Sequence, residues 1–320
     1  MSYKINKIVI WGHKFHRHTH SYIHNGYYKA FKKLGYNVEW YGNDDDVTNV
    51  DFSNALFITE HQGDEKMPLR NDCLYVIHNI DNSTKKYDIP DENIINLKCS
   101  HRDNDMCNNI RTFNETEHSF YGHKKHIIYF TLWATDLFPE EINENIKNID
   151  TILKKRDNGM FYHIGMASQT WLGIMNHLHY DLGLNIRHLG GVWQDKPEMD
   201  EYEAMEFTQK SALPLALQDI DQIKLNYVPC RIFKNISYGR MGVTNNPFVN
   251  TFFDNKLVYN SDIKQCIQQA IKFESLPLEK RKALIVGLME KVRDHHTYIN
   301  RVEDLCNFIS IFTQFVFIQR

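Results

Sequence analysis

Short apolar runs that end in glycine or in polar residues recur through the first part of the chain. They occupy 7–11, 37–41, 55–59, 74–78, 94–98 and 126–130. Continuous apolar runs of this length are typical of strands that are buried on both faces of a parallel sheet. Between the first two runs, a helical pattern extends from Ser21, its predicted cap, to about Leu34. This opening predicts a right-handed βαβ unit and a doubly wound α/β domain.

A second set of strand and helix patterns follows a charged segment. The segment 140–155 is predicted to be a helix within a connector at 136–158. Beyond it, the apolar run 160–165 predicts the first strand of another α/β domain. The other predicted strands are 185–189, 213–217 and 242–244, and the predicted helices are 169–182, 200–211, 230–239, 262–273, 278–295 and 299–318. The patterns therefore predict domains at 1–135 and 159–295, followed by a helical segment at 296–320.

The composition narrows the classes of function. The formal net charge of -3 argues against a general nucleic-acid binder, because such proteins usually carry a basic surplus. No apolar run reaches the roughly 20 residues that a membrane-spanning helix needs, and the charged N-terminus does not read as a signal peptide. The six cysteines are scattered without a CxxC pair, which indicates free thiols in a reducing compartment. We therefore expect a cytoplasmic protein with no membrane span.

The stretch 230–246 carries the strongest chemical signal. It is predicted to be a basic amphipathic helix that ends at Gly239 and leads into a short strand with a polar tip. Free backbone N–H groups, the positive end of the helix dipole and two cationic side chains then meet at the helix start, where they suit a phosphate. Small residues after the strand at 160–164 let a diphosphate approach the backbone closely. The predicted donor-binding residues, which together indicate a nucleotide-sugar site, are Gly165, Arg231, Lys234, Asn235, Ser237, Asn245 and Asn246.

Histidines crowd the turn after the first predicted strand. In open α/β sheets the loops at the carboxyl ends of the strands line the ligand crevice, so several imidazoles are expected where chemistry occurs. A histidine has a pKa near neutrality and is suited to deprotonate an acceptor hydroxyl as a general base. The candidate bases are His13, His16, His18 and His20. The predicted acceptor-binding residues, at the ends of the runs 55–59 and 74–78, are Glu60, His61 and His78.

The pair His18-x-His20 also resembles the metal-binding pair that opens metal-dependent hydrolase barrels. Such barrels need further histidines and an aspartate at later strand ends, and His61, His78 and His163 do lie at predicted strand ends. The pattern farther along the chain, however, predicts two domains rather than the repeated βα units of a barrel. A metal-dependent hydrolase is therefore the alternative to a nucleotide-sugar enzyme.

In their order along the chain, three segments resemble glycosyltransferases of the GT-B fold. They are 11–24 with 28–31 and 34–36, the connector 133–139, and the helix and strand 231–246 with 257–259 and the helix from Asp262. The likeness is closest to glycosyltransferase group 1 and CgeB-like sequences of bacteria and large DNA viruses. It implies two Rossmann-like doubly wound domains facing a cleft, the first binding the acceptor and the second binding the nucleotide-sugar. It also implies that the last helix crosses back to the first domain, and that an inverting enzyme places its base in the loop after the first strand.

Retaining members of that group commonly carry Glu-x7-Glu at the helix equivalent to 230–239. Here Lys234 follows Phe233, and no glutamate lies between Arg231 and Asn246, so we expect inversion with a histidine base. The resemblance implies hexosyl or deoxyhexosyl transfer from a UDP- or GDP-linked sugar to a glycan or another hydroxyl acceptor, with no bound metal or other cofactor. A non-catalytic nucleotide- or sugar-binding protein is a further alternative.

Overall fold

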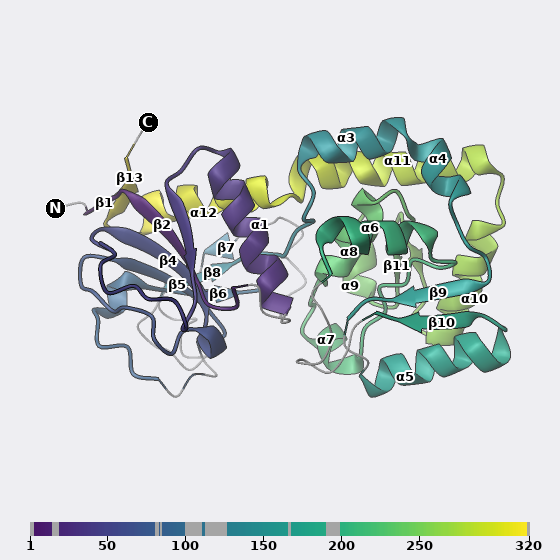
Figure 1. Ribbon diagram of the computed structural model, residues 1–320. Helices are drawn as coiled ribbons and strands as arrows, with labels where there is room; N and C mark the ends of the chain where they lie inside the picture. Colours follow the sequence, from purple (N-terminus) through teal and green to yellow (C-terminus); the bar gives the residue numbers. More distant parts are fainter. Residues whose placement is uncertain are drawn as a thin grey trace. The chain divides into compact units, whose positions relative to one another are not determined.

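The chain forms two compact units in the computed structural model (Figure 1). The structure describes residues 3–14, 19–80, 83, 85–99, 111–112, 127–165, 168–189 and 199–318. The first unit contains the described residues from Tyr3 to Cys99, those up to Leu132 and those from Tyr298 onward, whereas the second runs from Trp133 to Thr297. The last helix of the chain therefore belongs to the first unit.

A sheet with the strand order β3-β2-β4-β5-β6-β8-β7 forms the centre of the first unit. Its described neighbours pair in parallel, apart from β7 with β8. The strands are β2 (Lys7–Trp11), β3 (Val38–Tyr41), β4 (Ala55–Glu60), β5 (Leu74–His78), β6 (Ile94–Lys98), β7 (Arg111–Thr112) and β8 (Ile127–Phe130). The parallel strands match the apolar runs of the sequence to within one residue at each end, which confirms the predicted parallel α/β sheet.

Both faces of this sheet are covered, and for this reason β4 and β5 are buried along their whole length. On one face lies helix α1 (Thr19–Lys33), whose His24 and Tyr28 contact the ring of Trp40 on β3. The opposite face carries a core of strand side chains and of residues from the segments between strands, and its aromatic members include Trp11, Phe52, Phe57 and Tyr75.

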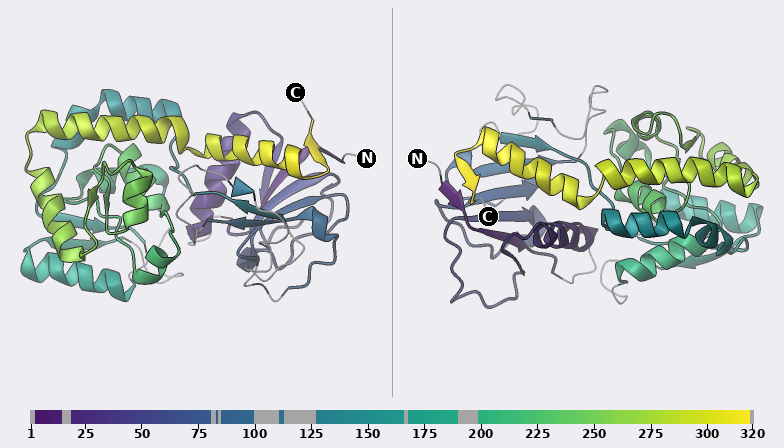
Figure 2. Two further views of the ribbon diagram at one scale, coloured as in Figure 1. Left: turned by 180° about the vertical axis from the view of Figure 1, so that it is seen from behind. Right: turned by 90° about the horizontal axis from the view of Figure 1, so that it is seen from above.

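Helix α12 (Tyr298–Phe312) packs beside α1 and lies across the sheet of the first unit (Figure 2). Phe308 contacts Tyr129 of β8, with the ring centroids 4.8 Å apart. Gly26 of α1 permits the close approach of the two helices, because a Cβ atom there would lie 2.3 Å from the ring of Tyr298. The buried Arg301 donates from Nε to the carbonyl oxygen of Leu132 at 2.8 Å, which ties α12 to the end of β8.

The prediction of one helix over 299–318 is wrong at its end, because α12 stops at Phe312 and the chain then forms β13 (Phe315–Phe317). Thr313 marks the change: its hydroxyl donates to the carbonyl of Ile309 at 2.7 Å and accepts from the N–H of Phe315 at 3.0 Å. β13 pairs in parallel with β1 (Tyr3–Ile5), a strand that the sequence patterns missed. A Phe-Val-Phe run favours a strand because aromatic and β-branched side chains fit a half-buried pleated surface.

The second unit is built on short parallel strands. β9 (Met160–His163) pairs with β10 (Asn185–His188), and β11 (Val243–Thr244) pairs with β12 (Val258–Tyr259). The segment 212–216 connects these pairs, since Ala212 donates to the carbonyl of Met160 at 2.8 Å and Leu215 forms a bridge with Val243. The predicted strand at 213–217 is therefore reduced to one bridge. Pro214 explains this result, because proline has no N–H to donate to a ladder.

Helices surround these strands. They are α3 (Pro139–Lys147), α4 (Ile149–Lys154), α5 (Gln169–Asn176), α6 (Glu201–Lys210), α7 (Ile220–Lys224), α8 (Cys230–Ser237), α9 (Pro247–Phe252), α10 (Ile263–Glu274) and α11 (Leu278–His295). The predicted helix 140–155 is interrupted at Asn148, which ends α3 and precedes α4. The predicted helix 169–182 continues beyond α5 as the π-helix His177–Asp181. Ser21 is not the cap of α1 but lies in its first turn.

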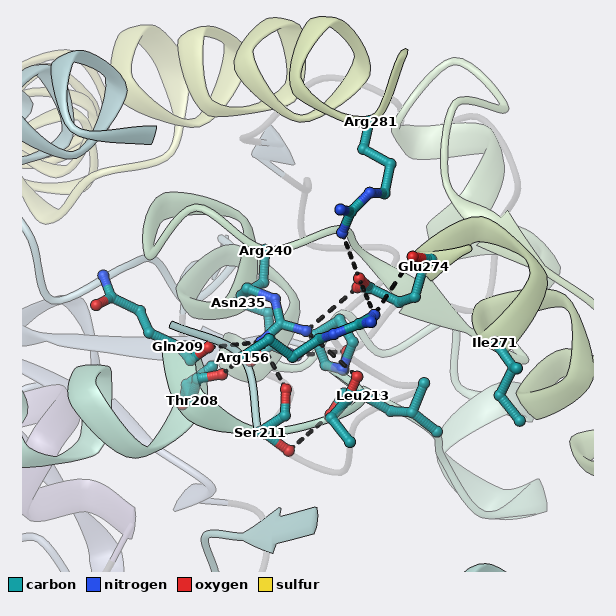
Figure 3. Close-up of polar contacts among 12 residues, drawn as sticks. Arg156, Thr208, Gln209, Ser211, Leu213, Asn235, Arg240, Ile271, Glu274 and Arg281 are labelled. Carbon is teal, nitrogen blue, oxygen red and sulfur yellow. Dashed lines mark hydrogen bonds and ion pairs between the residues drawn. The ribbon is translucent and has the colours of Figure 1, made fainter. Parts of the chain in front are cut away.

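A buried charge cluster joins three parts of the second unit (Figure 3). Arg240 is 1% exposed and donates to the carbonyl oxygens of Gln209 and Ser211 at 2.7 and 2.6 Å, so it satisfies the last turn of α6. Glu274, at the end of α10, accepts from Arg240 at 3.2 Å and also pairs with Arg156 and Arg281, at 2.7 and 2.9 Å. One carboxylate thus neutralises part of the charge of three guanidinium groups.

In the described part of the chain, no helix is both long and apolar enough to cross a membrane. No disulfide joins the described cysteines, which are Cys73, Cys99, Cys230, Cys266 and Cys306.

Candidate functional site

The first unit contains a point where the strand order reverses. β2 lies between β3 and β4, so the chain moves to one side of β2 first and to its other side afterwards. In open α/β sheets, ligands bind outside the carboxyl ends of the strands at such a point. His13 lies two residues beyond the end of β2, and Glu60 is the last residue of β4. The fold therefore brings together two residues that are 47 positions apart in the sequence.

The backbone after β2 has an unusual conformation. Gly12 has φ +80°, and a Cβ atom at this position would lie 2.5 Å from the carbonyl oxygen of Gly63, so only glycine fits without a shift. His13 also has a positive φ, of 51°. Positive φ is uncommon for a residue other than glycine, and such residues concentrate at functional sites. The turn is held by Ser21, whose hydroxyl donates to the carbonyl of His13 at 2.8 Å.

His13 and Glu60 form a buried pair. Nε2 of His13 lies 3.1 Å from Oε2 of Glu60, and the side chains are 9% and 1% exposed. The same carboxylate accepts from the N–H of Gln62 at 2.9 Å and lies 2.7 Å from Nδ1 of His61. Burial alone would raise the pKa of Glu60, but the hydrogen bonds from His13 and Gln62 and the charges of the two imidazoles lower it from 4.5 to about 2. Glu60 is therefore a carboxylate that orients the ring of His13.

A second hydrogen-bonded row begins at His20 in the first turn of α1. Nε2 of His20 lies 2.9 Å from Nδ1 of His78, the last residue of β5, and Nε2 of His78 lies 3.2 Å from Sγ of Cys99. His78 is only 8% exposed, and burial lowers its pKa from 6.5 to about 3. His78 is therefore a neutral imidazole at physiological pH. In this form one ring nitrogen of His78 donates a hydrogen bond and the other accepts one.

The structure brings together His13, His20, Glu60, His61 and His78, which the sequence analysis had assigned to two different roles. The candidate bases His16 and His18 lie outside the described residues. Sequence reasoning missed Lys98 and Cys99 at the end of β6, although this run had been identified as a strand. Burial lowers the pKa of Lys98 from 10.5 to about 8, which places a titratable ammonium at the same edge of the sheet.

In the second unit, Arg231 lies at the carboxyl end of β9. Its Nη2 donates to the carbonyl of Ile164 at 2.8 Å, and its guanidinium carbon lies 4.7 Å from the ring centre of Trp171 on α5. Gly165 has φ +119°, and a Cβ atom at this position would lie 3.0 Å from Nη2 of Arg231. Burial lowers the pKa of Arg231 below its usual range. A guanidinium that is already partly desolvated and held in place gains more from an anion than a fully solvated one does.

Arg231 is the second residue of α8, and the start of this helix offers further donors. Pro229 is its N-cap, no described side chain caps its first turn, and the first turn contains no acidic residue. The N–H groups of an uncapped helix start are a favourable site for an anion. Ser168, by contrast, caps α5 by accepting from the N–H of Trp171. Gly165, Arg231 and the start of α8 therefore form the part of the predicted donor site that suits a diphosphate.

Lys234 is paired with a buried carboxylate. Its Nζ lies 2.6 Å from Oδ2 of Asp136, and both oxygens of this aspartate accept from the hydroxyl of Tyr238, at 2.7 and 2.8 Å. Asp136 is 7% exposed. The motif 133–139 that carries the sequence resemblance thus supplies the counter-ion of the basic helix. Any contribution of Lys234 to diphosphate binding is offset by this charge.

The remaining predicted donor-binding residues are buried and bonded within the unit. Asn235 donates to the carbonyl of Pro214 at 2.9 Å, and the hydroxyl of Ser237 lies 2.7 Å from that of Thr135. Asn245 exchanges two hydrogen bonds with the backbone of Gln218, at 2.8 and 2.9 Å, which ties β11 to segment 212–218.

Asn246 is fully buried and caps α9 by accepting from the N–H of Phe248 at 2.9 Å. These contacts give each of the four residues a structural function, while a role in donor binding stays a prediction.

The chain matches no protein-family description and no curated protein sequence. Solved structures do resemble it. An alpha-glucosyltransferase in complex with UDP aligns over 95% of this chain and 99% of its own, with a TM-score of 0.55 and 11% identity. An alpha-glucosyltransferase in complex with UDP and a 13-mer DNA containing a HMU base aligns with the same TM-score and coverage, at 12% identity.

The catalytic domain of Starch Synthase IV from Arabidopsis thaliana, bound to ADP and acarbose, aligns over 94% of this chain and 98% of its own, with a TM-score of 0.55 and 10% identity. The likeness therefore extends over nearly the whole length of each protein. At such identities it is a likeness of fold, and the described chain has the two-domain α/β fold of GT-B glycosyltransferases.

Proposed function

We propose that this protein is an inverting glycosyltransferase that moves a hexosyl or deoxyhexosyl group from a UDP- or GDP-linked sugar to a hydroxyl acceptor. The observation that carries the proposal is the position of Arg231, which lies in the first turn of α8 at the carboxyl end of β9, where no described side chain caps the helix. A half-buried cation next to the N–H groups of a helix start is suited to the two phosphates of a nucleotide-sugar. Gly165 leaves room for them near the backbone.

His13 is the proposed general base. When its Nε2–H donates to Glu60, the lone pair of the neutral ring is on Nδ1. The imidazole accepts the proton of the acceptor hydroxyl while the hydroxyl oxygen attacks the anomeric carbon of the donor sugar. The bond from this carbon to the diphosphate oxygen breaks, and the nucleoside diphosphate leaves. Glu60 stabilises the imidazolium that forms, as a buried carboxylate next to a catalytic histidine does in other enzymes.

His61 and His78, which lie next to this pair, are proposed to shape the acceptor site. We propose a glycan or another hydroxyl compound as acceptor. One neighbour of the same fold was solved with DNA, but the net charge of -3 of this chain disfavours a nucleic-acid acceptor. Diphosphate binding by Arg231 and the α8 N–H groups requires no bound metal ion, since these groups offset the charge of the leaving group.

The first test is the thermal stability of the purified protein with UDP, GDP, CDP and dTDP and with their sugar conjugates, without magnesium. A nucleotide at about 100 times its Kd adds roughly 2.7 kcal/mol of stability, which is a measurable shift in Tm. Stabilisation by one nucleotide family supports the proposal and identifies the class of donor. Donor hydrolysis or transfer, followed by NMR at the anomeric carbon, then separates a transferase from a protein that only binds the nucleotide.

A matched pair of variants tests the assignment of Arg231. Arg231→Gln removes a charge-assisted contact worth about 1.5–3 kcal/mol, so nucleotide affinity should fall by at least about tenfold. Lys224→Gln removes an exposed cation from α7 and should leave the affinity unchanged. Equal affinity of wild type and Arg231→Gln would show that the diphosphate binds elsewhere.

A further inference from the structure

We propose that His13, His20 and Glu60 form a binding site for a divalent transition metal of the Zn²⁺ type, and that the bound metal inhibits sugar transfer. Each residue offers one ligand atom, and the three atoms lie within 4.8 Å of one another. His20 and Glu60 are buried, and the side chain of His13 is 9% exposed. The inhibition, but not the binding, rests on the proposed role of His13 as the base.

The distances are close to those of a coordinated ion. Zn²⁺ binds imidazole nitrogen and carboxylate oxygen at about 2.0–2.2 Å, so two ligand atoms of a tetrahedral site lie roughly 3.3 Å apart. Nε2 of His13 and Oε2 of Glu60 are already 3.1 Å apart. The ligand atom of His20 needs to approach these two by at most about 1.5 Å. A small movement of one side chain therefore completes the set.

The outer contacts of the ligands are those of a metal site. Metal-binding histidines usually have their other ring nitrogen hydrogen-bonded, and metal-binding carboxylates accept further hydrogen bonds. Glu60 accepts from the N–H of Gln62 at 2.9 Å, and the ring of His20 is held by His78 at 2.9 Å. His78 is in turn held by Cys99 at 3.2 Å. Glu60 and His20 are thus oriented before any ion binds.

The donor set selects the class of metal. Two imidazoles and one carboxylate suit Zn²⁺ or Co²⁺ and leave one tetrahedral position open for water, whereas Ca²⁺ and Mg²⁺ require oxygen ligands. A neutral imidazole has a single lone pair. A metal on His13 occupies this lone pair, so the ring has none left to accept the proton of an acceptor hydroxyl. Metal binding and base catalysis at His13 are therefore mutually exclusive.

Binding is measured first, on the full chain, by equilibrium dialysis against Zn²⁺ and by the visible absorption of Co²⁺ in the protein. We expect one metal ion per chain and a Co²⁺ spectrum typical of four-coordinate nitrogen and oxygen ligation. His13→Asn and Glu60→Gln should each lower the affinity by more than tenfold. Asparagine is chosen because it tolerates the positive φ of His13, so the fold is retained. His177→Ala removes a histidine of the second unit that is paired with Asp181, and should change nothing.

Circular dichroism confirms that each variant is folded, and His20→Gln provides an independent third test of the same site. Equal metal affinity in wild type, His13→Asn and Glu60→Gln would overturn the proposal. It would also be overturned if His177→Ala were the one variant that abolished metal binding.

The inhibition is tested separately with the donor and acceptor of the wild-type enzyme. Loss of transfer on adding one equivalent of Zn²⁺, restored by a chelator, supports it, and full activity of the Zn²⁺-loaded protein refutes it. If the protein binds the metal but transfers no sugar, the proposed function is contradicted and the proposed metal site is not.

Discussion

Replacing Glu60 by glutamine should weaken both the stability and the activity of the protein, and the loss of stability should depend on pH. The pKa of Glu60 is about 2 in the folded chain, compared with an ordinary value of 4.5. At about 1.36 kcal/mol for each pKa unit, the ionised carboxylate stabilises the fold by about 3 kcal/mol near neutral pH. The glutamine variant loses this contribution, because an amide cannot supply the negative charge.

The sign of the pH dependence follows from the lowered pKa. A carboxyl with a lower pKa in the folded state stabilises the fold fully above its unfolded pKa, and this contribution is lost as the pH falls through the folded value. Between about pH 7 and about pH 3, the difference in unfolding free energy between wild type and Glu60→Gln should therefore shrink by about 2 kcal/mol. Urea denaturation at the two pH values measures it. Glu65→Gln, which changes an exposed neighbour, is the control.

Kinetics give the second readout for the same variant. General acid–base catalysis contributes about 10²–10⁴-fold, and Glu60 orients the proposed base, so kcat should fall by about 10²-fold with little change in the KM for the donor. A difference in stability that is the same at both pH values would refute the assigned ionisation of Glu60. Wild-type kcat in a variant shown to be folded would refute its positioning role.

Other predictions concern packing and charge in each unit. Glu274→Ala leaves three arginines without their shared carboxylate, so urea denaturation should show a loss of about 3–5 kcal/mol; a loss below about 1 kcal/mol would contradict the buried cluster. Gly26→Ala places a methyl group against the ring of Tyr298 and should cost about 1–3 kcal/mol. In a Tyr298→Ala background, Gly26→Ala should no longer lower the stability, because the ring that the methyl group meets is absent. A loss of stability that persists in this background would show that the contact with Tyr298 is not its cause. Lys234→Met should lower nucleotide affinity less than Arg231→Gln does, because its ammonium already pairs with a carboxylate; calorimetric titration with equal losses would contradict this ranking.

Local patterns in the sequence were sufficient to locate the buried parallel strands of the first unit. A strand buried on both faces must be apolar at nearly every position, so β2, β4, β5 and β6 were recognisable without knowledge of their partners. The polar residue after such a run must lie near the carboxyl edge of the sheet. For this reason His13, Glu60 and His78 could be identified as candidates from the sequence. The basic helix start with Arg231 was recognisable for a similar reason, because an apolar helix face leaves its cations at one place.

Only the tertiary structure decided which of these residues meet. The position of β2 between β3 and β4 places His13 against Glu60, and no local pattern encodes this order of strands. The partner of Lys234 is equally distant in the sequence: Asp136 lies in a turn that a local pattern would assign to solvent. The end of the chain became a strand because β1 offered an edge to pair with. The periodicity of a sequence indicates only which positions avoid water. The partners of a polar side chain, its burial and its pKa depend on contacts between segments that are distant in the sequence. These contacts form only when the whole sheet assembles.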